Sequence, residues 1–312
     1  MTLLNMGKLL AAKDQTDFAL ASHHPGPSPL DNSSGIPFMA IGGVVHWCLG
    51  YGDQALKKAY ETLAVANRTA RPFDLALAQY YVSLIHLLRR EAPAAQEAAD
   101  CLISLATEHG FPEQLQLAIG LRGWSVALQG HHQEGIVQLE ESLSARQASG
   151  AGAARPYFLT LLAEARTRIG RFDAAASALT EALACADEQE ERYYESEMHR
   201  VKGDLLLKQN RSSSIEALAC LKRAVEVASN QSAKSLELRA TMSMARLLAS
   251  QGHHAEARTM LSAIYNWFTE GCDTADLKDA KTLLDELSQQ PTLHPFPNGR
   301  PPRDPSGHVR IR

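Results

Sequence analysis

The sequence lacks any apolar run long enough to cross a lipid bilayer. The longest run spans residues 36–45 of the 312-residue chain, about half of the roughly 20 residues that a transmembrane helix needs. The first twelve residues carry one lysine and no recognisable cleavage site, so they do not resemble a secretory signal. These absences predict a soluble, cytoplasmic protein without a membrane partner.

The sequence also lacks an excess of either charge. It has 31 Lys and Arg residues against 35 Asp and Glu residues, which gives a net charge of -4. Nucleic-acid-binding proteins normally present a basic face, so this balance argues against such a partner. The cysteines are few, with five in the chain. Because they are odd in number and far apart, they indicate reduced thiols rather than a disulfide framework.

Catalytic motifs are absent as well. The chain has no G-x-x-x-x-G-K-[ST] loop, in which glycines and a lysine cradle phosphates. It has neither a G-x-S-x-G elbow nor an H-E-x-x-H pair. We therefore predict that the chain is not an enzyme and needs no cofactor.

Two histidine pairs and one acid–histidine pair could in principle carry chemistry. His131–His132 and His253–His254 occupy equivalent places directly after glycines, but a metal site needs further ligands that converge on them. We interpret both pairs as solvated turns and predict no metal site. Glu195 and His199 stand one helical turn apart, a spacing that suits acid–base work but is more typical of an ordinary i,i+4 polar pair.

What the chain does contain is a repeat. A small or turn-forming residue recurs at positions 50, 90, 130, 170, 210 and 252, and an alanine or glycine follows each one after five to seven residues. The pairs are Gly50 with Ala55, Arg90 with Ala95, Gly130 with Gly135, Gly170 with Ala175, Asn210 with Ala217, and Gly252 with Ala257. A fixed period of this size indicates stacked supersecondary units in one elongated domain.

Each unit is predicted to be a helical hairpin. Apolar residues recur at steps of three and four, for example Ala175, Leu179 and Ala182, which is the period of one helix face. The small residues should lie where the two helices cross, because backbones approach to about 8 Å only when the contacting side chains are small. Gly123 and Gly203 occupy the matching place on the first helix of their hairpins.

The two ends differ from the repeats. We predict a divergent, flexible segment at residues 1–35, a repeat domain at residues 36–288, and a disordered tail rich in Pro and Arg at residues 289–312. Before the tail, apolar residues follow one helix face at Leu277, Ala280, Leu283, Leu284 and Leu287. We expect this helix to cap the open end that a solenoid would otherwise expose.

These positions resemble the tetratricopeptide repeat. The best copy places Ala163, Gly170, Ala175, Leu179 and Ala182 at its signature positions, although the period exceeds the usual one. The resemblance implies an all-α, right-handed solenoid of about six helical hairpins.

A second resemblance is more specific. The stretches at 49–56, 121–124, 154–159, 234–240 and 264–271 are similar to the C-terminal repeat region of bacterial signalling proteins that carry a class III adenylate/guanylate cyclase or an AAA-type ATPase. Those catalytic domains are absent here. The resemblance implies a non-catalytic regulatory module for bacterial signal transduction, whose partner is a protein or peptide, including an ATPase or cyclase domain in cis or in trans.

In such repeats the first helix of each unit lines a concave groove, where aromatic residues supply contact area and charges set register. The matching positions here are Tyr80, Trp124, Tyr157, Glu164, Arg168, Glu197, Arg200, Asp204, Lys208, Arg239 and Arg246. Two alternatives stay open at this point: Trp124 and Tyr157 pack between hairpins, and the charged residues form a solvated face. A small-molecule sensor that encloses an effector near Trp124 and Tyr157 is the alternative function.

Overall fold

The computed structural model describes residues 2–22, 35–69 and 71–289. The expected disordered tail at 289–312 lies almost wholly outside these residues, as do residues 23–34 of the N-terminal segment. Within the described residues the regular structure is entirely helical. The elements are α1 Leu9–Ser22, α2 Ile36–Cys48, α3 Gly52–Thr69, α4 Pro72–Leu88, α5 Ala92–His109, α6 Pro112–Leu128, α7 His132–Ala148, α8 Arg155–Arg168, α9 Phe172–Glu188, α10 Glu195–Gln209, the short η1 Arg211–Ser213, α11 Ser214–Asn230, α12 Lys234–Ser250, α13 His254–Tyr265 and α14 Ala275–Gln289.

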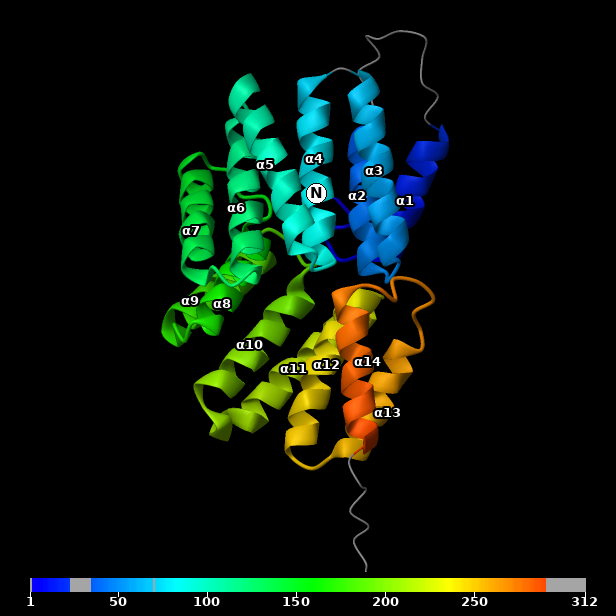
Figure 1. Cartoon of the computed structure of the whole chain (residues 1–312), viewed down its shortest axis with the longest axis vertical. Coiled ribbons are helices and arrows are strands. Elements are labelled where there is room, and N and C mark those ends of the chain that lie inside the picture. The colour runs from blue at the N-terminus through cyan, green and yellow to red at the C-terminus, as the bar shows by residue number, and fades with distance from the viewer. Residues whose placement is uncertain (1, 23–34, 70, 290–312) are drawn as a thin grey trace, which may run out of the picture.

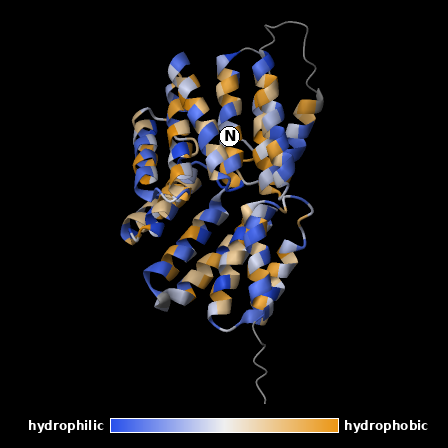
Figure 2. Cartoon of the chain, viewed as in Figure 1, coloured by the Kyte–Doolittle hydropathy of each residue, from blue (hydrophilic) through white to orange (hydrophobic). Residues whose placement is uncertain are grey.

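The predicted all-α architecture is confirmed. Helices α2 to α13 pack in sequence as six TPR-like hairpins, and α14 packs against α12 and α13 at the end of the array. The turn glycines Gly50, Gly130, Gly170 and Gly252 all have positive φ, a conformation that glycine adopts without a Cβ clash. Hydrophobic residues recur along the helices between hydrophilic ones (Figure 2), which gives each helix an apolar face to bury.

The small residues lie at the helix crossings, as predicted. A Cβ added to Gly123 would lie 2.9 Å from the carbonyl oxygen of Gly135, and one added to Gly135 would lie 2.7 Å from the Cβ of Ala127. At Gly203 an added Cβ would lie 2.8 Å from Cγ of Leu221. These distances are shorter than ordinary van der Waals contact, so glycine is what permits the close approach of α6 to α7 and of α10 to α11.

Helix α1 packs against α2, although it belongs to the N-terminal segment that we expected to differ from the repeats. Leu4, Leu9 and Ala12 are buried in the same hydrophobic cluster as the first hairpins. The backbone carbonyl of Asn5 accepts a hydrogen bond from Tyr193 N at 3.2 Å. Residues 2–22 are therefore part of the packed body and reach the start of α10.

The two ends of the array meet. The hairpins wind so far that α12 contacts α2, and Figure 1 shows the later hairpins as a second tier beneath the earlier ones. Ser235 Oγ donates to the carbonyl oxygen of Trp47 at 2.6 Å, across 188 residues. An added Cβ on Gly50 would lie 3.1 Å from Cη2 of Trp267. The ring of Trp267, which follows the last hairpin, therefore packs against the first turn of the array.

Candidate functional site

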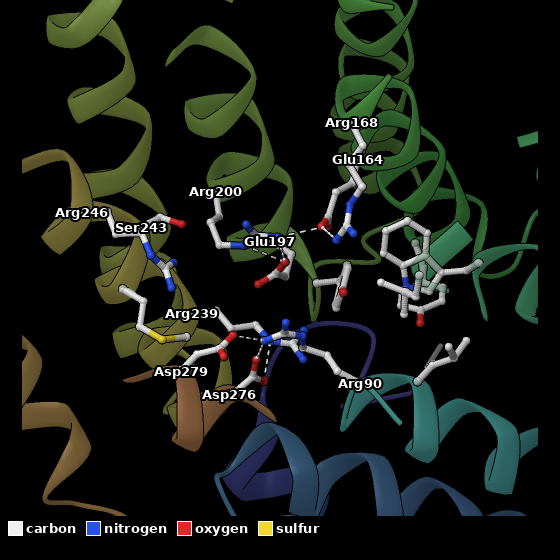
Figure 3. Close-up of a pocket in the computed structure, with 16 residues that line it drawn as sticks. Arg90, Glu164, Arg168, Glu197, Arg200, Arg239, Ser243, Arg246, Asp276 and Asp279 are labelled. Atoms are coloured by element: carbon white, nitrogen blue, oxygen red, sulfur yellow. Dashed lines mark hydrogen bonds and ion pairs between the residues drawn. The ribbon is translucent and has the colours of Figure 1, made fainter. Parts of the chain in front are cut away.

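The winding of the array encloses a cavity of about 270 Å³ (Figure 3). It is surrounded by the first helices of hairpins two to six and by the start of α14. Its lining residues are Leu87, Arg90, Trp124, Leu128, Tyr157, Glu164, Arg168, Tyr194, Glu197, Arg200, Arg239, Met242, Ser243, Arg246, Asp276 and Asp279.

Most of the residues predicted for the groove meet here. Those that line the cavity are Trp124, Tyr157, Glu164, Arg168, Glu197, Arg200, Arg239 and Arg246. Asp204 and Lys208 lie beside it and line two adjoining hollows. Tyr80 does not lie at the cavity: its ring packs against Tyr81 at 5.0 Å between centroids and joins the hydrophobic core.

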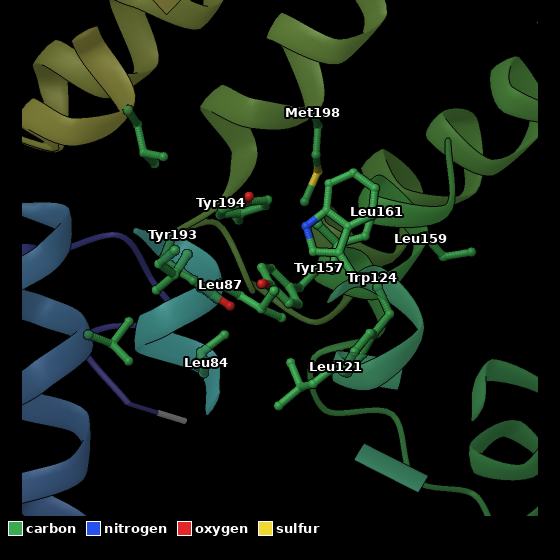
Figure 4. Packing of buried hydrophobic residues seen from close by; sticks show 14 of the residues in the cluster. Leu84, Leu87, Leu121, Trp124, Tyr157, Leu159, Leu161, Tyr193, Tyr194 and Met198 are labelled. Atoms are coloured by element: carbon green, nitrogen blue, oxygen red, sulfur yellow. The ribbon is translucent and has the colours of Figure 1, made fainter. Parts of the chain in front are cut away.

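Three aromatic residues, Trp124, Tyr157 and Tyr194, line the cavity, and Figure 4 shows them within the packed hydrophobic cluster. Tyr157 and Tyr194 pack at 4.8 Å between ring centroids, and Trp124 is only 5% exposed. The guanidinium of Arg168 lies 5.4 Å above the Trp124 ring, within range of a cation–π interaction. Burial raises the pKa of Tyr157 and Tyr194, so both phenols stay protonated at neutral pH. Trp124 and Tyr157 thus pack between hairpins and also face the cavity.

A connected set of ion pairs joins α8 to α10 along the cavity wall. Its five residues, which we call the inner cluster, are Glu164, Arg168, Glu197, Arg200 and Asp204. Arg200 contacts Oε2 of Glu197 at 2.7 Å, Oδ2 of Asp204 at 2.6 Å and Oε2 of Glu164 at 3.2 Å. Arg168 contacts Oε1 of Glu164 at 2.8 Å. The predicted charged face is therefore a paired network within a largely buried wall.

The inner cluster fixes the ionisation of its members. Burial alone would raise the pKa of Glu164, but Arg200 and Arg168 outweigh it and lower the pKa to about 2. For Asp204 the balance goes the other way, because burial raises its pKa more than Arg200 lowers it. Burial disfavours the charged form of Arg200, yet its carboxylate partners raise its pKa above the ordinary value. Glu164 is therefore ionised, and Arg200 protonated, at neutral pH.

A second group of ion pairs closes the cavity at α14. Asp276 accepts from Arg239 Nε at 2.7 Å and from Arg90 Nη1 at 3.1 Å, and Arg90 Nη1 also donates to Asp279 at 2.7 Å. Arg239 Nη2 donates to the carbonyl oxygen of Leu88 at 2.6 Å. Two guanidinium groups face two carboxylates, so this group is neutral as a whole.

Our prediction from the sequence missed Arg90, Tyr194, Ser243, Asp276 and Asp279 as lining residues. One signal was available at Arg90, which stands where four other copies of the repeat have glycine. It has φ 64°, an uncommon conformation for a residue with a Cβ. The acidic residues of α14 carried no such signal, because only the folding back of the array brings them to the cavity.

The other polar candidates do not join this site. Glu195 and His199 lie 3.7 Å apart as an i,i+4 pair, and Glu195 also faces Arg192 and Arg223. The neighbouring His199 imidazole lowers the pKa of Glu195. Among the described residues no three His, Cys, Asp or Glu side chains converge as metal ligands do. Within the same residues, no helix has the length and apolar character that a membrane span requires.

Comparison with models of known protein families gives no match, and comparison with curated proteins gives none either. Solved structures do match. A Rap protein complexed with competence and sporulation factor aligns with a TM-score of 0.65 at 12% identity, over 91% of this chain and 73% of the other. NprR in complex with its cognate peptide NprX gives a TM-score of 0.58 at 12% identity, over 91% and 82%.

A third match is the APC/C hetero-tetramer Cut9–Hcn1, with a TM-score of 0.57 at 13% identity, over 91% of this chain and 47% of the other. At such low identity these similarities establish the fold and nothing finer. The fold that they share is an array of helical hairpins, in proteins solved with a bound peptide, factor or protein partner.

Proposed function

We propose that this chain is a non-catalytic, cytoplasmic regulatory module that binds a peptide segment in its central cavity. The observation that carries the proposal is the convergence of five first helices on one cavity lined by aromatic rings and charged groups of both signs. Rigid aromatic side chains supply contact area at a low entropic cost, and charged groups orient a polar backbone and its termini. NprR, which has the same kind of fold, was solved with a peptide bound.

A cavity-filling variant tests the proposal. Ser243 is 6% exposed and lines the cavity, so Ser243→Phe should occupy the space that a peptide needs. We expect the full chain to capture members of a randomised synthetic pentapeptide pool, measured by mass spectrometry, and Ser243→Phe to lose that capture. The matched control is Ser177→Phe on the exposed face of α9. Equal capture by the two variants, both folded by circular dichroism, would refute the cavity as the binding site.

A small-molecule sensor is the second candidate, and the size of the cavity favours it. A volume of about 270 Å³ lies just below the range of roughly 300–1,000 Å³ typical of small-molecule pockets. Thermal shift assays with a metabolite set would distinguish the two functions. Stabilisation by a metabolite that Ser243→Phe abolishes, with no capture from the peptide pool, would favour the sensor.

In either case we propose that the module controls a signalling ATPase or nucleotide cyclase, in cis or in trans. Support for this finer assignment comes only from the sequence resemblance of the stretches at 49–56, 121–124, 154–159, 234–240 and 264–271. Co-expression with the products of neighbouring reading frames is the test. Co-elution with an ATPase or cyclase would support the assignment, and the absence of any such complex would contradict it.

A further inference from the structure

The charges that line the cavity do not balance. Five arginines and four carboxylates face it. Four of the arginines contact these carboxylates, and every one of the four carboxylates has an arginine partner. The fifth arginine is Arg246, which is exposed and forms no ion pair with any residue that the structure describes. In Figure 3 it lies beside Ser243, apart from the ion pairs drawn between the other labelled side chains. The cavity therefore carries one positive charge without a partner.

The hollow that adjoins the cavity has an excess of the same sign. It has a volume of about 630 Å³, lies between α10 and α12, and contains the charged residues Asp204, Lys208 and Arg246 in its lining. Asp204 contacts Arg200 at 2.6 Å. Lys208 is exposed and, like Arg246, makes no ion pair within the described part of the chain. Both unpaired charges are thus positive, and a concave surface with such an excess attracts an anion.

Apolar contacts are available on both sides of these cations. Leu207 and Leu247 line the hollow, and the rings of Trp124 and Tyr157 line the cavity. The lining of both spaces includes Ser243, so the two spaces adjoin. An inorganic anion would use the charges alone, whereas a peptide that carries a carboxylate would use the charges together with the apolar surface.

We infer that the module binds an acidic peptide, one carboxylate of which pairs with Arg246 where the cavity and the hollow adjoin. The guanidinium donates to the carboxylate in a charge-assisted hydrogen bond, and Lys208 adds a second positive charge in the hollow. An apolar side chain of the peptide packs on Leu207 and Leu247. An Asp or Glu side chain and the carboxyl terminus of a peptide present the same group, and the test below separates these two sources. This inference rests on the proposed peptide-binding function.

Three randomised pentapeptide pools test the inference on the unmodified full chain, with capture measured by mass spectrometry. The first pool contains Asp and Glu and ends in an amide. The second lacks Asp and Glu and ends in a free carboxyl group. The third lacks Asp and Glu and ends in an amide, so it has no carboxylate.

We expect the first pool, the second or both to be captured at least about tenfold more than the third, the effect of one charge-assisted hydrogen bond. An excess from the first pool assigns the carboxylate to a side chain, and an excess from the second assigns it to the terminus. Equal capture of all three pools would overturn the inference and leave the proposed function standing. Capture from none of them would overturn both.

Variants identify the groups responsible. Arg246→Gln should lower the ratio of carboxylate-bearing to carboxylate-free capture several-fold, and Lys208→Gln should lower it less. The matched controls Arg258→Gln on α13 and Lys222→Gln on α11 should leave the ratio unchanged. All four residues are exposed, so these replacements should leave the chain folded, as circular dichroism would verify. An unchanged ratio in folded Arg246→Gln would overturn the placement of the carboxylate at Arg246.

Discussion

Arg90 donates from Nη1 to Oδ1 of Asp276 at 3.1 Å, joining the second hairpin to the last helix across 186 residues of sequence. Asp276 accepts from Arg239 through its other oxygen. A single carboxylate thus holds together three elements that surround the cavity. The contact exists only because the array winds back on itself, and it brings the start of α14 to the cavity as part of its lining.

The conformation of Arg90 gives the first prediction. At φ 64° a residue with a Cβ is strained by roughly 1–2 kcal/mol, whereas glycine is not. Arg90→Ala and Arg90→Gly lose the same contacts to Asp276 and Asp279, but only glycine relieves the strain. We expect Arg90→Gly to be more stable than Arg90→Ala by about 1 kcal/mol in urea unfolding, since the greater freedom of glycine in the unfolded chain offsets part of the gain. Identical stabilities would show that the turn is unstrained.

Replacing a turn glycine by alanine is the opposite change, and it checks the same strain argument at another turn. Gly170 has φ 77° and no atom lies within 4 Å of an added Cβ. Gly170→Ala therefore introduces strain without a steric clash, and it should cost about 1 kcal/mol.

The crossing of α6 and α7 gives the second prediction. Gly135 lies inside α7, where alanine normally stabilises a helix by up to about 1 kcal/mol relative to glycine. Here the added methyl would lie 2.7 Å from the Cβ of Ala127, so Gly135→Ala should instead destabilise the protein by about 1–3 kcal/mol. Thermal unfolding measures the difference, with Ser177→Ala on an exposed face as control. A gain in stability would contradict the close approach of the two helices.

The third prediction concerns pH. The pKa of Glu164 is lowered in the folded protein to about 2, from an ordinary value of 4.5. A lowered pKa stabilises the fold above the unfolded value, and this stabilisation is lost as pH falls from about 4.5 towards 2. We expect a contribution of at most about 3 kcal/mol at neutral pH, from about 1.4 kcal/mol per pKa unit. Glu164→Gln should flatten the acid limb of the stability curve measured by urea unfolding, and an unchanged limb would contradict the role of its ion pairs with Arg168 and Arg200.

The hairpins were predictable from the sequence because their signals are local. Turn glycines and crossing residues such as Gly123 and Gly135 determine how the two helices of a hairpin pack together. The positions of Trp124, Tyr157 and Arg200 on first helices followed from the repeat register, and the structure places them at one cavity. The contact between the two ends of the array was not predictable in this way. Small rotations between neighbouring repeats accumulate along the array, and no single repeat records their sum. The sequence therefore predicted a capping helix through Leu287, but not that Asp276 at its start would line the cavity.

The closure itself gives the last prediction. Glu270, in the loop before α14, accepts hydrogen bonds through Oε1 from the backbone N–H groups of Asp53 and Gln54 at 3.0 and 3.1 Å. These groups open α3 and lack partners within their own helix, so Glu270 caps a helix of the first hairpin from the far end of the array. A carboxylate there is also stabilised by the helix dipole.

Glu270→Ala should therefore cost about 1 kcal/mol, the usual value of an N-cap, whereas Glu256→Ala on the exposed face of α13 should cost little. Hydrogen exchange locates the effect: protection should fall at the first turn of α3 and in α14, at opposite ends of the array, while α8 and α9 stay unchanged. Loss of protection at α14 alone would mean that the two ends are stabilised independently. In that case the cavity would open without disturbing the first hairpin.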